Sequence, residues 1–172
     1  MSLMQAARPL DPWRWLGWPA LGCVVATVLF AFPFKLFGLQ APEPVFPMIL
    51  AFAWARIRPS VLAPFMLLML GLLLDLYGGG PLGLWAVSLL APYAVVLFSR
   101  NIMTGQSTGM RAISYVGSVA LAMATGYLLT TIDASEPPNL VAVFWQFLAT
   151  CLLYPFSHGL IERFEDADVR FR

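Results

Sequence analysis

Asp75 is the residue of this chain whose type and position most suggest chemistry. It ends a run of sixteen uncharged residues that begins at Pro59, and a second apolar stretch follows soon after it. A carboxylate inside hydrocarbon costs roughly 2.5–3.5 kcal/mol on insertion scales. Such a group could relay a proton or an ion, but relays need several acids or histidines in the membrane, and this segment has one. We therefore favour a structural role.

In that role Asp75 caps the turn between two helices, and the turn is built from Gly78, Gly79, Gly80 and Pro81. The expected donors to the carboxylate are the accessible amides of the three glycines or the side chain of Lys35. If Asp75 does not fix the hairpin, it serves a partner helix.

Other residue types that could carry chemistry do not form a recognisable constellation. His158 is expected at a membrane interface, close to Glu162 and Arg163. The chain shows no Ser/His/Asp set, no metal-ligand spacing and no phosphate loop. The two cysteines, Cys23 and Cys151, lie in apolar runs and are interpreted as packing residues. We expect no enzyme activity, no cofactor and no metal.

The composition indicates that lipid is the solvent for most of the chain. Hydrophobic residues make up 60% of the sequence, against roughly 45–50% in soluble domains. Charged residues make up 11%, against about 25%. The 172 residues leave room for one domain, 1–172, and the net charge of +1 gives no reason to expect nucleic acid as a partner.

Uncharged windows predict an all-α integral membrane protein with six transmembrane helices. A span needs about 20 helical residues, and the predicted spans are residues 15–38, 42–56, 59–77, 81–99, 112–132 and 138–161. With both termini in the cytoplasm, nine of the ten basic residues lie inside and only Lys35 lies outside. This distribution follows the positive-inside bias and favours six crossings over five. The predicted localisation is a multi-pass protein of a bacterial cytoplasmic (inner) membrane.

The fifth predicted span carries a stripe of small residues on one helical face. They recur every fourth residue, at Ser114, Ser118, Ala122, Gly126 and Thr130. Small residues let helix backbones approach closely, and hydroxyls can hydrogen-bond across such a contact. The stripe either packs within the chain or contacts another membrane protein.

About a third of the chain, from residue 41 to residue 100, resembles the rod shape-determining membrane protein MreD of bacteria. The resemblance is carried by Pro42 and Glu43, Trp54, Arg58 and Pro59, the string from Gly71 to Leu76 with Asp75 inside it, and the string Gly80-Pro81-Leu82-Gly83-Leu84. Chain length and the predicted six spans also fit. One departure is the triple glycine before Pro81, where members of the family commonly have fewer glycines.

The resemblance implies a fold similar to the substrate-binding subunits of energy-coupling-factor vitamin transporters. It also implies a non-enzymatic scaffold or regulator of the cell-elongation (rod) complex, which supports lateral peptidoglycan synthesis and cell shape. The implied partners are the bitopic protein MreC, the MreB actin-like filament, the RodA glycosyltransferase and its transpeptidase.

The alternative is a small-molecule, vitamin-like binding subunit of a membrane transporter. Its site would need several polar and aromatic side chains that converge on an outward pocket. The predicted external loops offer mainly Lys35, Gln40, Glu43, Asp133 and Glu136. This is a small set for a dedicated site, so the scaffold hypothesis is preferred.

Overall fold

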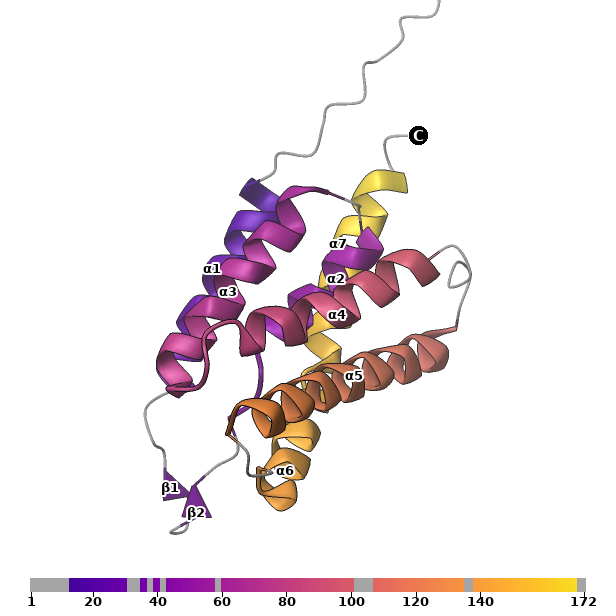
Figure 1. Ribbon diagram of the computed structural model, residues 1–172. Helices are drawn as coiled ribbons and strands as arrows, with labels where there is room; N and C mark the ends of the chain where they lie inside the picture. The colour runs from indigo at the N-terminus through magenta and orange to yellow at the C-terminus, as the bar shows by residue number, and fades with distance from the viewer. Residues whose placement is uncertain are drawn as a thin grey trace, which may run out of the picture.

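The computed structural model describes residues 13–30, 35–36, 39–40, 43–57, 60–100, 107–134 and 138–169, and these form a helical bundle (Figure 1). In chain order the elements are the π-helix η1 (Trp13–Gly17), α1 (Trp18–Phe30), β1 (Lys35–Leu36), β2 (Leu39–Gln40), α2 (Pro47–Ile57), α3 (Leu62–Gly78), α4 (Leu84–Ser99), α5 (Thr108–Ala134), α6 (Leu140–Cys151) and α7 (Tyr154–Val169). The two strands form one short antiparallel pair. The start of η1 and the end of α7 lie at one end of the bundle, and β1 and β2 lie at the other (Figure 1).

Three helical segments of the described residues are long and apolar enough to cross a membrane. They are Trp13–Phe30, Thr108–Asp133 and Leu140–Phe164. The apolar helices α2, α3 and α4 are shorter. At 1.5 Å per residue, the 11 residues of α2 extend roughly 17 Å, little more than half of a hydrocarbon core of about 30 Å.

Two predicted spans differ from the helices that form. The first predicted span, 15–38, is too long, because α1 ends at Phe30 and Lys35–Leu36 belong to β1. The second difference is in span 138–161, which consists of two helices separated by Leu152 and Leu153. Pro155 explains this break: it has no amide hydrogen to donate to the carbonyl four residues earlier, so the ladder of α6 cannot continue.

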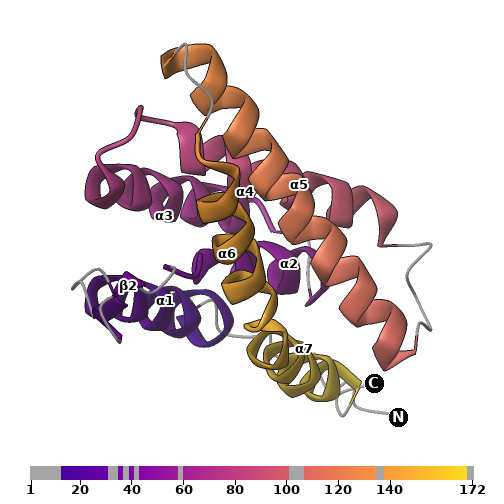
Figure 2. The same ribbon diagram turned by 90° about the horizontal axis from the view of Figure 1, so that it is seen from below.

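Helix α2 forms the centre of the bundle. Its residues from Leu50 to Ala55 are at most 1% exposed. Seen from below, α2 lies inside the arrangement of α1, α3, α4, α5, α6 and α7 (Figure 2). A helix that is apolar on all sides is expected where protein surrounds it completely. The other helices therefore separate α2 from any lipid.

Side-chain hydrogen bonds connect α2 and the segment before it to η1 and α6. The indole Nε1–H of Trp54 donates to the carbonyl oxygen of Trp15 in η1 at 3.0 Å. Just before α2, the backbone amide of Val45 donates to the Oγ1 of Thr150 in α6 at 3.1 Å. Since these groups are buried, each bond satisfies a polar atom that has little access to water.

The outer surface of the bundle is also apolar. Large hydrophobic side chains are exposed on each of the outer helices α1, α3, α4, α5 and α6, among them Leu29, Phe65, Phe98, Ile113 and Phe144. A soluble domain rarely exposes apolar surface on so many elements. Together with the three helices of spanning length, this surface is typical of a protein that associates with a membrane.

Replacing Trp54 with phenylalanine should destabilise the protein, because it removes the donor to the buried carbonyl of Trp15. An unsatisfied buried acceptor costs about 1–3 kcal/mol. We expect W54F to lower the midpoint of thermal unfolding of the purified protein in detergent. The matched control is Trp18→Phe, since Trp18 is 67% exposed. Equal midpoints for the two variants would show that the bond does not stabilise the bundle.

Candidate functional site

Asp75 joins the last turn of α3 to the first turn of α4. Its side chain is buried, with 2% of the residue exposed. Carboxylate Oδ2 accepts a hydrogen bond from the backbone amide of Gly83 at 2.7 Å, and Oδ1 accepts one from the amide of Trp85 at 2.8 Å. The carbonyl oxygen of Asp75 accepts a third bond, from the amide of Gly79 at 3.1 Å. Asp75 thus links the end of α3, the turn at Gly79 and the start of α4.

This arrangement explains how a carboxylate is accommodated in an apolar bundle. The first amides of a helix have no partner within the helix, and a Ser, Thr, Asp or Asn side chain at the N-cap position often satisfies one of them. The N-cap residue of α4 is Gly83, which has no side chain to do so. Asp75 supplies the carboxylate from eight residues earlier in the chain. Charge-assisted hydrogen bonds and the positive end of the helix dipole together offset the loss of hydration.

The donors to Asp75 differ from those that the sequence suggested. They are the amides of Gly83 and Trp85, not those of the triple glycine, and the side chain of Lys35 lies outside the described residues. The glycines have another function in the hairpin. Gly79 ends α3 with a φ of 64°, and Gly83 begins α4 with a φ of 97°. Both angles are in the left-handed region, which residues with a Cβ adopt at a cost.

Gly71 brings the two helices of the hairpin into backbone contact. It lies one turn before Asp75, on the same face of α3. A Cβ atom built on Gly71 would lie 2.3 Å from the Cα of Ala86 and 2.5 Å from its backbone nitrogen. There is no flexible side chain at this contact that could move aside. The absence of a side chain at Gly71 is therefore what allows α4 to approach the carboxylate of Asp75.

The small-residue stripe of α5 packs against α4 of the same chain over at least part of its length. A Cβ atom on Gly126 would lie 3.2 Å from the Oγ of Ser88, and both Ser118 and Ala122 are buried. The hydroxyls of the stripe do not bond across this contact in the structure. Ser114, Ser118 and Thr130 donate instead to the carbonyl four residues earlier in α5. These serines and threonines satisfy their own hydroxyls locally, as such side chains often do in helices.

Of the remaining residues singled out in the sequence, those of the turn lie beside Asp75, whereas Trp54 and Glu43 lie elsewhere. Trp54 lies in the core and bonds to η1. Glu43 is exposed just before α2, at the end of the bundle where α3 turns into α4. Arg58 and Pro59 lie outside the described residues. Within the turn, Gly78 and Gly80 have open space around their Cα atoms, and the carbonyl of Pro81 accepts a bond from the amide of Leu84.

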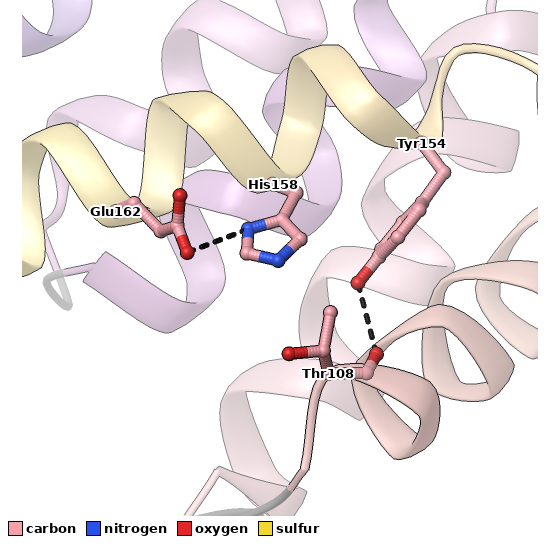
Figure 3. A network of polar contacts seen from close by, with 4 residues as sticks. All are labelled: Thr108, Tyr154, His158 and Glu162. Carbon is pink, nitrogen blue, oxygen red and sulfur yellow. Dashed lines mark hydrogen bonds and ion pairs between the residues drawn. The ribbon is translucent and has the colours of Figure 1, made fainter.

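A polar cluster on α7, which the sequence analysis recognised only in part, connects that helix to the start of α5 (Figure 3). The Nδ1 of His158 lies 3.4 Å from an oxygen of Glu162, and the hydroxyl of Tyr154 donates to the carbonyl of Thr108 at 3.1 Å. The rings of Tyr154 and Tyr115 also pack, at a centroid distance of 5.6 Å. The signal was present in the spacing, because residues 154, 158 and 162 share one helical face. The cluster joins helices and contains no nucleophile paired with a base.

The described residues contain no group of three or more His, Cys, Asp or Glu side chains that could hold a metal ion. Comparisons of the chain with protein-family models, with curated proteins and with solved structures find no match.

A methyl group at position 71 should disrupt the hairpin. Gly71→Ala forces the backbones of α3 and α4 apart, which also breaks the bonds from α4 to Asp75. We expect a large loss of folded, monodisperse protein in size-exclusion chromatography of detergent extracts. Gly22→Ala is the matched control, because nothing lies within 4 Å of a Cβ built there in α1. A normal elution profile for G71A would contradict the close approach.

Substitutions of Asp75 should destabilise the protein in a defined order. Asparagine keeps one oxygen acceptor but loses the charge and the second acceptor. Alanine loses the charge and both oxygen acceptors. Since a hydrogen bond to a charged group contributes about 1.5–3 kcal/mol, thermal unfolding midpoints should fall from wild type to Asp75→Asn to Asp75→Ala. Asp133→Asn, at the exposed end of α5, should leave the midpoint unchanged. An unaltered midpoint for Asp75→Ala would show that the carboxylate is dispensable.

Proposed function

We propose that this chain is a non-enzymatic membrane scaffold or regulator of the bacterial cell-elongation (rod) complex. In this role it supports cell shape and lateral peptidoglycan synthesis by holding partner proteins in the membrane. The proposal combines the sequence resemblance to MreD with the geometry of the hairpin between α3 and α4.

The observation that carries the proposal is that three of the resembling residues build one helix–helix contact, whereas Trp54 and Glu43 lie elsewhere. Gly71, Asp75 and Gly83 belong to the strings that resemble MreD, and each contributes to the contact between α3 and α4. The string from Gly71 to Leu76 and the string from Gly80 to Leu84 therefore specify one helix pair, which supports an architecture shared with the family that they resemble. The partner-binding function is inferred from the resemblance.

The proposed topology has six membrane passes with both termini in the cytoplasm. Support comes from the nine basic residues that this topology places on one side. It also comes from the position of the start of η1 and the end of α7 at the same end of the bundle. The short helix α2 is compatible with a pass because protein, not lipid, surrounds it. In this topology the hairpin turn at Gly78–Gly80 faces the periplasm.

The proposed mode of action is helix–helix contact with partners. The exposed apolar side chains of α1, α3, α4 and α6 offer surfaces to transmembrane segments of an MreC-like bitopic protein and a RodA-like glycosyltransferase with its transpeptidase. Association with an MreB-like filament would occur on the cytoplasmic side. Between apolar helices in lipid, such contacts depend on close packing, since lipid tails are as apolar as the side chains.

Affinity purification of the tagged chain from native membranes tests this function. We expect wall-elongation proteins to be enriched over the background of an unrelated tagged multi-pass protein at equal abundance. We also expect cells depleted of the chain to lose their rod shape, and wild-type protein to restore it. Recovery of transporter ATPases without wall-elongation proteins would refute the proposal and favour the transporter subunit.

A further inference from the structure

Two cavities lie at the end of the bundle where α3 turns into α4. The larger has a volume of about 240 Å³ and lies among the α3–α4 turn, α5 and α6. The smaller, of about 110 Å³, lies among the end of α1, the segment before α2 and the same turn. Both are lined by Gly78, Trp85 and Gln146.

The larger cavity contains polar groups that lack partners within the described part of the chain. The side-chain amide of Gln146 and the hydroxyl of Tyr127 line it, and neither forms a hydrogen bond to another described residue. Thr130 lines it as well. The side chains of Gln146 and Tyr127 are half-buried, so their polar atoms remain accessible from the cavity. Together they give it hydrogen-bonding groups that a ligand can use.

The lining of the larger cavity combines a carboxylate with aromatic and apolar side chains. Asp75 is the only charged residue that lines the larger cavity, Glu43 lines the smaller one, and no lysine, arginine or histidine lines either cavity. The two oxygens of Asp75 offer about four lone-pair sites, of which backbone amides occupy two. The aromatic side chains of Trp85 and Tyr127 also line the cavity, and aromatic faces attract cations. Leu84, Met123 and Val143 make other parts of the wall apolar.

We infer that this cavity binds a small organic amine in its cationic form. The ammonium group lies toward Asp75, Tyr127 and Gln146, and the apolar part of the ligand packs against Leu84, Met123 and Val143. A volume of 240 Å³ is below the roughly 300–1,000 Å³ of pockets that hold drug-sized ligands. That space suits a ligand as small as an arylalkylamine and is too small for a drug-sized molecule. The inference does not depend on the proposed scaffold function.

The test uses the purified full chain in phosphatidylcholine nanodiscs at pH 7, with phenethylamine as the probe. Isothermal titration calorimetry should show saturable binding of phenethylamine to loaded nanodiscs and none to empty ones. Two matched compounds, the neutral 2-phenylethanol and the anionic 3-phenylpropionate, should bind at least about tenfold more weakly. Equal affinity for all three compounds, or no saturable binding of the amine, would overturn the inference.

Two variants on the same helix locate the binding site. Val143→Phe fills the cavity and should weaken the affinity for phenethylamine at least about tenfold. Val141→Phe adds the same volume to a residue that is 62% exposed, and should leave the affinity unchanged. Retention of wild-type affinity by folded V143F would show that the amine binds elsewhere.

If V143F does not fold, Gln146→Leu decides the question. This variant removes the unpaired amide from the lining and keeps a similar volume, and the bonds to Asp75 are untouched. We expect at least a fivefold loss of affinity for phenethylamine, with the elution profile of wild type. An unchanged affinity would refute the assignment of the cavity.

Discussion

The hydrogen bonds from the start of α4 to the carboxylate of Asp75 determine how this bundle is arranged. A buried carboxylate must find donors, and the first amides of a helix must find acceptors. The amides of Gly83 and Trp85 meet both needs, because they donate to the carboxylate oxygens of Asp75 at 2.7 and 2.8 Å. The direction of α4 is thereby fixed relative to α3, and α5 in turn packs on α4 through Gly126 and Ser88. One electrostatic constraint thus positions three successive helices.

The sequence predicted the helical class, the turn and the place of Asp75 at the hairpin, because these depend on local patterns. Uncharged runs define apolar helices, and a string of glycines followed by proline defines a turn. The donors at Gly83 and Trp85 were missed because they depend on where α4 begins. That point is set by the left-handed conformation of Gly83, which composition does not reveal. Likewise, the local hydroxyl bonds of α5 and the early end of α1 follow from geometry that spacing alone does not determine.

The arrangement of apolar residues differs from that of a soluble protein of similar size. Phe52 and Trp54 are fully buried, while Phe65 and Phe98 are largely exposed. Hydrophobicity therefore cannot distinguish the inside of this bundle from its outside. Small residues mark two of the close contacts between helices, since a Cβ on Gly71 or Gly126 would meet atoms of α4, as expected where lipid removes the hydrophobic driving force between helices.

The central position of α2 has a consequence for biosynthesis. Its partners include Thr150 of α6, which bonds to the amide of Val45, and Ser157 of α7, which bonds to the carbonyl of Ile49. These pairs are separated by 105 and 108 residues. Because a ribosome releases the chain from its N-terminus, α2 leaves the ribosome long before the helices that enclose it. Assembly of the bundle must therefore finish after translation of α7, with α2 waiting in the membrane or in an insertase until then.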